Sequence, residues 1–160
     1  MKINIIGAGP AGLLFALLIK RRNPAWRVNV FEQNPPQATF GFGVVFSRNA
    51  LAFLERDVPD FHALLVPQLE SWPMQRIVHR DETVQIDGNG FSAIGRLELN
   101  QFLDALCRAA GVSIAYEQVI DSLAPVKDCD LLIGADGANS IVRRALDAAL
   151  EHTLPAFLTL

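Results

Sequence analysis

The sequence predicts an α/β fold with a central parallel β-sheet and an inserted antiparallel β-hairpin. The chain opens with an apolar run, a helical pattern and a second apolar run, together about 30 residues, the length of a β-α-β unit. Later stretches give helix, strand, strand and helix patterns. Two alternating runs around "RDE" at residues 80–82 predict the hairpin. The 160 residues are enough for one domain.

The first three elements follow from their apolar patterns. Residues 3–6, "INII", are a short apolar run with β-branched side chains, which suits a buried parallel strand. Residues 10–22 are apolar on most faces and end in three cations, which favours a buried helix with a basic last turn. Residues 27–32 alternate valine with polar residues and predict a second strand.

The rest of the chain is divided by glycine and proline. Two prolines and two glycines predict a long loop over residues 33–47. A helix follows over residues 47–57, with Ser47 as its N-cap. The remaining predicted elements are a hairpin in 74–88, a helix over 96–112 closing on Gly111, strands over 113–119 and 129–135, and a helix over 139–150.

Net charge, cysteine positions and the N-terminal pattern argue against several classes of function. The net charge of -3 and the lack of a long basic run argue against a nucleic-acid surface. Cys107 and Cys129 lie in apolar stretches without metal-ligand spacing, so we expect two reduced core thiols and no metal site. Glycines interrupt the apolar N-terminus, which argues against a signal peptide or a stable membrane insertion. We therefore expect a cytoplasmic protein.

The segment "GAGPAG" at residues 7–12 lies between the first predicted strand and helix. Gly7 permits a tight turn, Gly9 lets the backbone approach a pyrophosphate, and Gly12 lets the helix pack closely on the strand. Pro10 and Ala11 begin the helix and belong to the same cofactor-binding segment, because unpaired N–H groups at a helix N-terminus bind phosphate. This context makes the predicted fold Rossmann-like.

An acidic residue, Glu32, ends the second predicted strand at the distance expected for a ribose ligand. Its carboxylate would accept hydrogen bonds from the ribose hydroxyls and repel a 2′-phosphate. We include the next residue, Gln33, in the cofactor site. The pattern indicates a dinucleotide with an ADP half and leaves nicotinamide and flavin open. The alternative is a glycine-rich turn with no ligand.

The segment "CDLLIGADGANSIVRR" at residues 129–144 resembles the Asp-Gly motif of single-component flavin-dependent aromatic hydroxylases, the p-hydroxybenzoate hydroxylase family. The resemblance implies that Asp136 hydrogen-bonds the ribityl chain of FAD and that Gly137 keeps the backbone close to the cofactor. A carboxylate at the carboxyl end of a parallel strand faces the crevice where ligands bind. The alternative is that Asp136 only caps the last helix.

Two more segments are similar to this family. Residues 96–112 match its R-x-x-L-x-x-x-L helix, which implies that Arg96 lies near FAD; the alternative is an ordinary exposed arginine. Residues 40–51 resemble the branch that hydroxylates salicylyl-CoA or 2-aminobenzoyl-CoA, and the tryptophan-derivative hydroxylase of violacein synthesis. That resemblance implies that Gly41, Gly43 and Val44 lie near the flavin, and it leaves the role of Arg48 open.

The likeness covers residues 2–144 and gives the expected domain organisation. Residues 1–144 are predicted to be an FAD-binding domain, with 68–93 as the start of a substrate-domain insertion. Residues 145–160 are predicted to be an atypical tail of a chain truncated relative to the family, since the family's G-D-A-A-H-x-x-x-P segment is not found.

The resemblance implies the FAD-binding portion of a flavin-dependent monooxygenase that uses NAD(P)H and O2. Its expected partner is a small aromatic substrate, such as an aromatic CoA thioester or an indole derivative. The alternatives are a non-catalytic dinucleotide-binding fragment and another FAD-dependent oxidoreductase, such as a reductase. The sequence indicates no catalytic acid or base and no oligomeric state.

Overall fold

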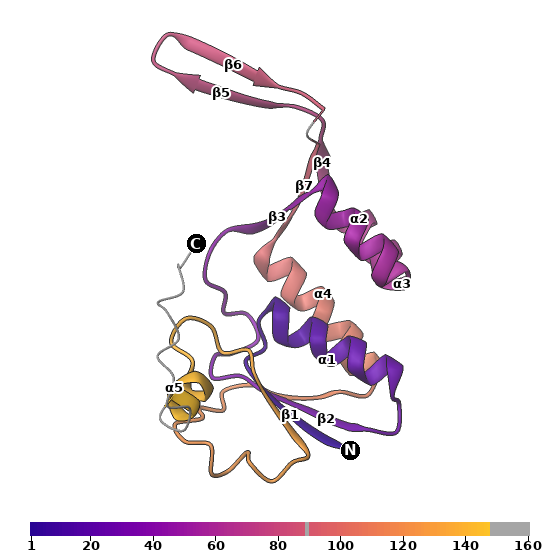
Figure 1. Cartoon of the computed structure of the whole chain (residues 1–160), viewed down its shortest axis with the longest axis vertical. Helices are drawn as coiled ribbons and strands as arrows, with labels where there is room; N and C mark the ends of the chain where they lie inside the picture. Colours follow the sequence, from indigo (N-terminus) through magenta and orange to yellow (C-terminus); the bar gives the residue numbers. More distant parts are fainter. Residues whose placement is uncertain (89, 148–160) are drawn as a thin grey trace. The chain divides into compact units, whose positions relative to one another are not determined.

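The computed structural model describes residues 1–88 and 90–147, which divide into two compact units (Figure 1). The first unit comprises residues 1–38 and the described residues from 100 onward, and the second comprises residues 39–99. The predicted substrate-domain insertion, residues 68–93, lies inside the second unit, and its role remains a prediction.

The first unit is built around parallel strands. Its elements are β1 (Lys2–Ile6), α1 (Pro10–Arg22), β2 (Arg27–Phe31), β8 (Ser113–Ala115), β9 (Leu131–Gly134) and α5 (Ile141–Asp147), with most of α4 (Arg96–Ala109). The strand order is β8-β2-β1-β9, and every pair is parallel. This confirms the predicted parallel sheet and the opening β-α-β unit. The carboxyl ends of β1, β2 and β9 therefore meet at one edge of the sheet.

Helices cover one face of this sheet. Leu13 and Leu17 of α1 are fully buried, as are Val28 and Val30 of β2. The Cys107 thiol of α4 donates to the Leu13 carbonyl oxygen at 3.2 Å, which joins α4 to α1. The buried helix predicted over residues 10–22 is therefore confirmed.

An irregular segment and α5 form the other hydrophobic layer. Its buried members are Ile6, Val126 and Val142. Partly buried apolar side chains surround them: Phe31, Ile120, Leu123, Leu132 and Ile141. The segment between β8 and β9 thus contributes to the core although the described part contains no regular element there.

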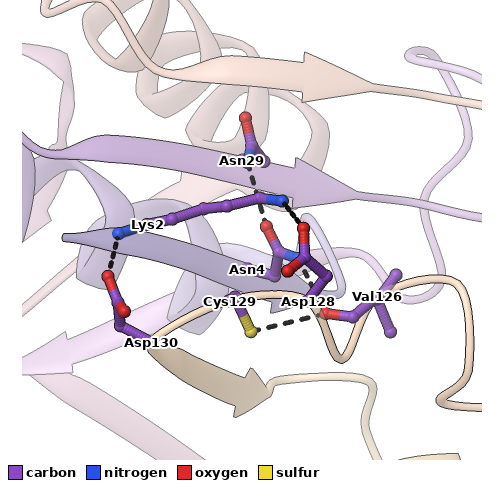
Figure 2. Close-up of polar contacts among 7 residues, drawn as sticks. All are labelled: Lys2, Asn4, Asn29, Val126, Asp128, Cys129 and Asp130. Atoms are coloured by element: carbon purple, nitrogen blue, oxygen red, sulfur yellow. Dashed lines mark hydrogen bonds and ion pairs between the residues drawn. The ribbon is translucent and has the colours of Figure 1, made fainter.

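A buried polar pair holds this segment against the sheet (Figure 2). The Asn4 side-chain amide donates to the Val126 carbonyl oxygen at 2.7 Å, and Asn29 donates to Asn4 Oδ1 at 2.9 Å. Asn4 is only 3 % exposed. At the nearby end of the strand, Lys2 Nζ pairs with Asp128 at 2.8 Å, which lowers the pKa of that exposed carboxyl. The polar contacts connect β1 to the segment that precedes β9.

The second unit contains an antiparallel sheet with strand order β3-β7-β4 and a separate hairpin. Its elements are β3 (Gly43–Ser47), α2 (Arg48–Asp57), α3 (Pro59–Leu65), a 3-10 turn (Val66–Gln68), β4 (Glu70–Trp72), β5 (Gln75–His79), β6 (Glu82–Ile86) and β7 (Phe91–Gly95). The predicted hairpin is confirmed as β5 and β6. Ser47 is the N-cap of α2, as predicted, because its Oγ accepts from the Ala50 N–H at 3.2 Å.

The predicted long loop over residues 33–47 is wrong in its last part, because residues 43–47 form β3. Its glycines and flanking prolines concealed the run Val44-Val45-Phe46, which pairs with β7 over five residues. The sequence also gave no signal for α3, β4 or β7. Short elements such as the three-residue β4 carry too little periodicity to be recognised without their partners.

Two strand boundaries and one prediction of burial need correction. The strand predicted over 113–119 ends at Ala115, and Glu117 has a φ of +56°, which is incompatible with a strand. The strand predicted over 129–135 covers 131–134 and is half-exposed, since β9 pairs only with β1 in the described part of the chain. Cys107 is buried as predicted, whereas Cys129 is only half-buried.

The remaining helix predictions are confirmed where the structure describes them. α4 begins at Arg96, and Gly111 has a φ of +85° just beyond its end. There the Val112 N–H donates to the Cys107 carbonyl oxygen at 2.9 Å, the pattern of a Schellman cap. α5 covers 141–147 of the helix predicted over 139–150. Residues 148–160, most of the predicted tail, lie outside the described residues.

Candidate dinucleotide site

The tight turn after β1 places two backbone segments in close contact. Gly7 has a φ of +103°, and its N–H donates to the Phe31 carbonyl oxygen at 2.8 Å. A Cβ atom at Gly7 would lie 2.3 Å from the Ala135 carbonyl oxygen, at the end of β9. A side chain at Gly12 would come within 2.1 Å of the Gly7 carbonyl oxygen. The protein's own packing therefore requires glycine at both positions.

Gly9 differs from these two glycines. It has extended backbone geometry at the N-cap of α1, and an added Cβ would meet no described protein atom within 4 Å. Packing within the protein therefore does not explain a glycine here. Open space over the backbone is what a phosphate group needs to approach the turn.

The first turn of α1 offers backbone donors beside Gly9. Pro10 occupies the first helical position and has no N–H, and Ala11 is exposed. The first hydrogen bond within the helix runs from the Leu13 N–H to the Gly9 carbonyl oxygen at 3.0 Å. The N–H groups of Ala11 and Gly12 come before it and therefore have no acceptor within the helix. The first turn contains no acidic side chain. These features suit an anion such as a phosphate.

Glu32 lies beside the turn at the end of β2. Its Oε2 accepts from the Ala8 N–H at 2.8 Å, and its Oε1 accepts from the Asn34 N–H and side-chain amide at 2.9 and 2.7 Å. A carboxylate oxygen can accept two hydrogen bonds, so Oε2 retains one acceptor position. The neighbouring Gln33 is exposed.

Asp136 follows β9 at the same edge of the sheet. The Ala135 N–H donates to the Ile6 carbonyl oxygen at 2.7 Å, which holds the two strand ends together. Asp136 Oδ1 accepts from Ser140 Oγ at 2.6 Å, and Oδ2 accepts from the Ile141 N–H at 2.7 Å. Oδ2 also accepts from the Val142 N–H at 3.5 Å. The carboxylate therefore caps α5, the alternative raised by the sequence, and Oδ1 keeps one acceptor position.

Gly137 has a φ of +74°, and a Cβ at this position would meet no described atom within 4 Å. As at Gly9, the surrounding protein does not require the missing side chain, although the backbone conformation favours glycine. The first unit thus brings together the turn at residues 7–12, Glu32 and the 135–137 turn at one sheet edge.

The other predicted cofactor residues belong to the second unit. Arg96 Nη1 donates to the Phe40 carbonyl oxygen at 2.7 Å, and its guanidinium lies 3.6 Å from the Cβ position of Gly41, whose φ is +97°. Arg96 Nε is buried and has no hydrogen-bond partner in the described structure. Such a donor is costly unless another group accepts from it.

A second buried polar atom without a hydrogen-bond partner in the described part of the chain lies two residues before Gly41. Thr39 Oγ1 is also buried without a partner in the described structure. Thr39 was not among the residues predicted from the sequence, although its hydroxyl comes directly before the segment "FGFG".

Gly43 is exposed at the start of β3, and Val44 beside it is half-buried. A Cβ at Gly43 would lie 3.0 Å from the Ile94 carbonyl oxygen, so pairing of β3 with β7 accounts for that glycine.

The groups with shifted pKa values are not the candidate site residues themselves, although the Glu32 carboxylate contributes to raising the pKa of Tyr116. Burial raises the pKa of the Cys107 thiol to about 12, with a smaller contribution from Asp104. Burial and a 2.9 Å hydrogen bond to Asp104 raise the pKa of Tyr116. Over residues 1–88 and 90–147 no group of three or more His, Cys, Asp or Glu residues could hold a metal ion. Within the same ranges, no helix combines the length and apolarity needed to cross a membrane.

Comparison with known proteins identifies relatives along most of the chain. No protein-family profile matches it. The chain is 38 % identical over 143 residues to salicyloyl-CoA 5-hydroxylase from a Streptomyces species, covering 89 % of this chain and 28 % of the relative. It is 34 % identical over 149 residues to protodeoxyviolaceinate monooxygenase from Chromobacterium violaceum, covering 87 % of this chain and 38 % of the relative.

The fold has a counterpart among solved structures. The tetrameric form of 2-methyl-3-hydroxypyridine-5-carboxylic acid oxygenase aligns with a TM-score of 0.76 and 24 % identity, covering 91 % of this chain and 42 % of that one. The chain thus spans less than half the length of these relatives. Along most of its own length, the chain is a homologue of part of salicyloyl-CoA 5-hydroxylase and of protodeoxyviolaceinate monooxygenase, and it shares its fold with part of the pyridine-carboxylate oxygenase.

Proposed function

We propose that this chain binds FAD and serves as the FAD-binding portion of a monooxygenase that hydroxylates an aromatic substrate with NAD(P)H and O2. The observation that carries the proposal is the meeting of the residue 7–12 turn, Glu32 and Asp136 at one edge of a parallel sheet. Ligands of open α/β sheets bind at this edge, outside the carboxyl ends of the strands.

The first unit would hold the ADP half of the cofactor. The N–H groups of Ala11 and Gly12 point out of the first turn of α1 and would bind the pyrophosphate over the open Gly9 backbone. The free acceptor position on Glu32 Oε2 would take a ribose hydroxyl. Its negative charge disfavours a 2′-phosphate, so NADP is not the ligand proposed for this turn.

The flavin half would use donors and acceptors that remain available. Asp136 Oδ1 has one acceptor position left for a ribityl hydroxyl. The orphaned Arg96 Nε would gain an acceptor, and Gly43 and Val44 would line the flavin with their backbone. Bound FAD would supply the redox chemistry that activates O2, while the residues of the chain orient the cofactor.

The substrate proposal rests on the relatives. They are named for a salicyloyl thioester of CoA and for protodeoxyviolaceinate. We therefore propose a small aromatic substrate, either an aromatic CoA thioester or an indole derivative. A dinucleotide-binding chain without hydroxylase activity is the second candidate, favoured by the capping contacts that already engage both oxygens of Asp136.

Titration of the purified chain with FAD tests the cofactor proposal. We expect saturable quenching of flavin fluorescence and a shift of its visible spectrum. Asp136→Ala should weaken FAD binding more than Arg143→Ala, because Arg143 is exposed and its guanidinium contacts only the Ala138 carbonyl oxygen here. Asp136→Asn keeps one acceptor for the Ile141 N–H and separates loss of the helix cap from loss of the cofactor ligand.

The outcome that contradicts the cofactor proposal is an unchanged flavin spectrum at high micromolar FAD. Equal effects of Asp136→Ala and Arg143→Ala would contradict the ribityl role alone. If FAD binds, NADH and NADPH oxidation should then be followed with and without an aromatic CoA thioester. Substrate-dependent product carrying a new hydroxyl indicates a hydroxylase, and oxidation without such a product indicates a reductase.

A further inference from the structure

A pocket in the second unit lies apart from every residue assigned above to the dinucleotide. Its volume is about 390 Å³. Its walls come from the start of α2, from β4 and from β7, and the residues that define it are Arg48, Leu51, Ser71, Trp72, Phe91 and Ser92. We refer to it as the Arg48 pocket.

One wall of the Arg48 pocket is aromatic. Trp72 and Phe91 are directly opposite in the β4–β7 register, and their rings stack with centroids 6.3 Å apart at an angle of 29°. Leu51 and Pro73 extend this apolar surface. A flat aromatic wall gains most from a planar ring, because stacked or edge-to-face contacts add to the burial of apolar area.

The described lining of the pocket carries a positive charge and no negative one. Arg48 is the only ionisable residue among those that line it, and it has no ion-pair partner in the described structure. Its guanidinium lies over Gly90, where a Cβ would be 3.4 Å from Nη2. Arg48 is the first residue of α2, where the helix dipole disfavours a cation. An anion in the pocket would remove this unfavourable interaction.

Two serines add polar groups to the lining of the pocket. Ser71 Oγ and Ser92 Oγ are 2.8 Å apart and share one hydrogen bond, and Ser92 is buried. One hydroxyl proton of the pair is not used by that bond, so it can be donated to a ligand atom. The pocket therefore combines an aromatic wall, one cation and one hydroxyl donor.

We propose that the Arg48 pocket binds a planar aromatic anion, an arene carboxylate. Its ring packs against Trp72 and Phe91, and its carboxylate pairs with the guanidinium of Arg48, whose fork of donors matches two carboxylate oxygens. The inference goes beyond the proposed FAD function, because it assigns a separate ligand site that shares no residue with the dinucleotide site.

Trp72 provides a direct reporter of this site. The chain contains two tryptophans, so Trp26→Phe leaves Trp72 as the only one. In this variant, benzoate should change the Trp72 emission in a saturable manner. Benzamide, which has the ring without the charge, should bind at least tenfold more weakly. Cyclohexanecarboxylate, which has the charge without the planar ring, should also bind several-fold more weakly.

Two arginines on the same helix give a matched pair of variants. Arg48→Ala should raise the dissociation constant for benzoate at least tenfold and abolish the preference for benzoate over benzamide. Arg56→Ala should change the benzoate dissociation constant and the preference for benzoate over benzamide by less than twofold. Arg56 is exposed and pairs with Asp57, outside the pocket. Circular dichroism should confirm that both variants are folded.

Saturation-transfer NMR of benzoate with the unmodified chain repeats the test without Trp26→Phe. The proposal is overturned by unsaturable benzoate signals, by equal binding of benzoate and benzamide, or by equal effects of Arg48→Ala and Arg56→Ala. FAD titration of the same preparations keeps the two proposals separate. Benzoate binding without FAD binding would contradict only the cofactor proposal, and FAD binding without benzoate binding would contradict only this one.

Discussion

Two glycines of the same turn, Gly9 and Gly12, should respond differently to substitution by alanine. A Cβ at Gly12 would lie 2.1 Å from a backbone oxygen, whereas a Cβ at Gly9 would meet nothing within 4 Å. Gly12→Ala should therefore lower the free energy of unfolding by about 1–3 kcal/mol, the usual effect of overpacking. Gly9→Ala should leave stability nearly unchanged and weaken FAD binding, since its Cβ occupies the approach of the pyrophosphate.

Urea unfolding and FAD titration of both variants check this prediction. Gly12→Ala should lose stability with FAD absent, and Gly9→Ala should lose only affinity. Equal stability losses would show that the open space at Gly9 is not reserved for a ligand. Gly88→Ala is unsuitable as a control despite its open surroundings, because its φ of +70° adds backbone strain.

The buried Cys107 thiol makes stability sensitive to alkaline pH. Burial raises its folded pKa to about 12 from an ordinary value of 9.0. Above pH 9 the unfolded chain releases this proton while the folded chain keeps it, so the free energy of unfolding falls as pH rises from about 9 to about 12. The steepest slope from one such group is about 1.4 kcal/mol per pH unit.

Urea unfolding of the unmodified chain and of Cys107→Ala at pH 8 and pH 10 measures this contribution. Cys107→Ala should cost stability at pH 8, because the thiol packs against α1 and donates to Leu13. The difference between the two proteins should shrink by about 1 kcal/mol at pH 10. Parallel pH curves would contradict the assigned role of the thiol.

At the scale of elements, the Asn4 pair stabilises the irregular layer over the sheet. Removing the Asn4 amide leaves the buried Val126 carbonyl oxygen and the Asn29 side chain without their partner. Asn4→Ala should therefore lower the free energy of unfolding by about 1–3 kcal/mol. In a double-mutant cycle, Asn29→Ala should cost much less in the Asn4→Ala background than alone; additive losses would contradict the shared network.

The β5–β6 hairpin is the element with the weakest support. It pairs only with itself among the described strands, and nine of its ten strand residues are exposed. An isolated two-stranded hairpin is marginally stable in water. Its amide protons should exchange far faster than those of β1 and β2, as hydrogen-exchange mass spectrometry can measure. Similar protection in both places would show that the hairpin has further contacts.

Sequence patterns predicted elements where local residues determine the structure. The run "INII", the glycine turn and the Ser47 cap needed no distant partner to be recognised. β3 and β7 were missed because pairing of Gly43 with Gly95 joins residues far apart in the chain. The same limit applies to the candidate site: Asp136 and its alternative role as a cap of the last helix were predicted from the local motif, whereas the lack of a partner for the buried Thr39 hydroxyl among the described residues became visible only in the structure.

At the scale of the whole molecule, the proposed cofactor joins residues that the sequence separates widely. Glu32 and Asp136 follow β2 and β9, the two strands that flank β1 in the sheet of the first unit. The relatives are more than twice as long as this chain. Binding of FAD and turnover of a substrate are therefore separate properties, and FAD binding is the one that can be measured directly on this chain.

Thermal unfolding with different parts of the cofactor tests how much of FAD the chain holds. A ligand that binds only the folded state stabilises it by about 2.7 kcal/mol at a concentration of 100 times Kd. For a chain of this size, that corresponds to a rise in Tm of roughly 5–10 °C. ADP can use the glycine turn and Glu32 but has no ribityl chain for Asp136. At equal concentrations we expect FAD to raise Tm more than ADP does, and Asp136→Ala to reduce that advantage. If ADP and FAD raise Tm equally, the chain holds only the nucleotide half, which supports the dinucleotide-binding alternative over the flavin site.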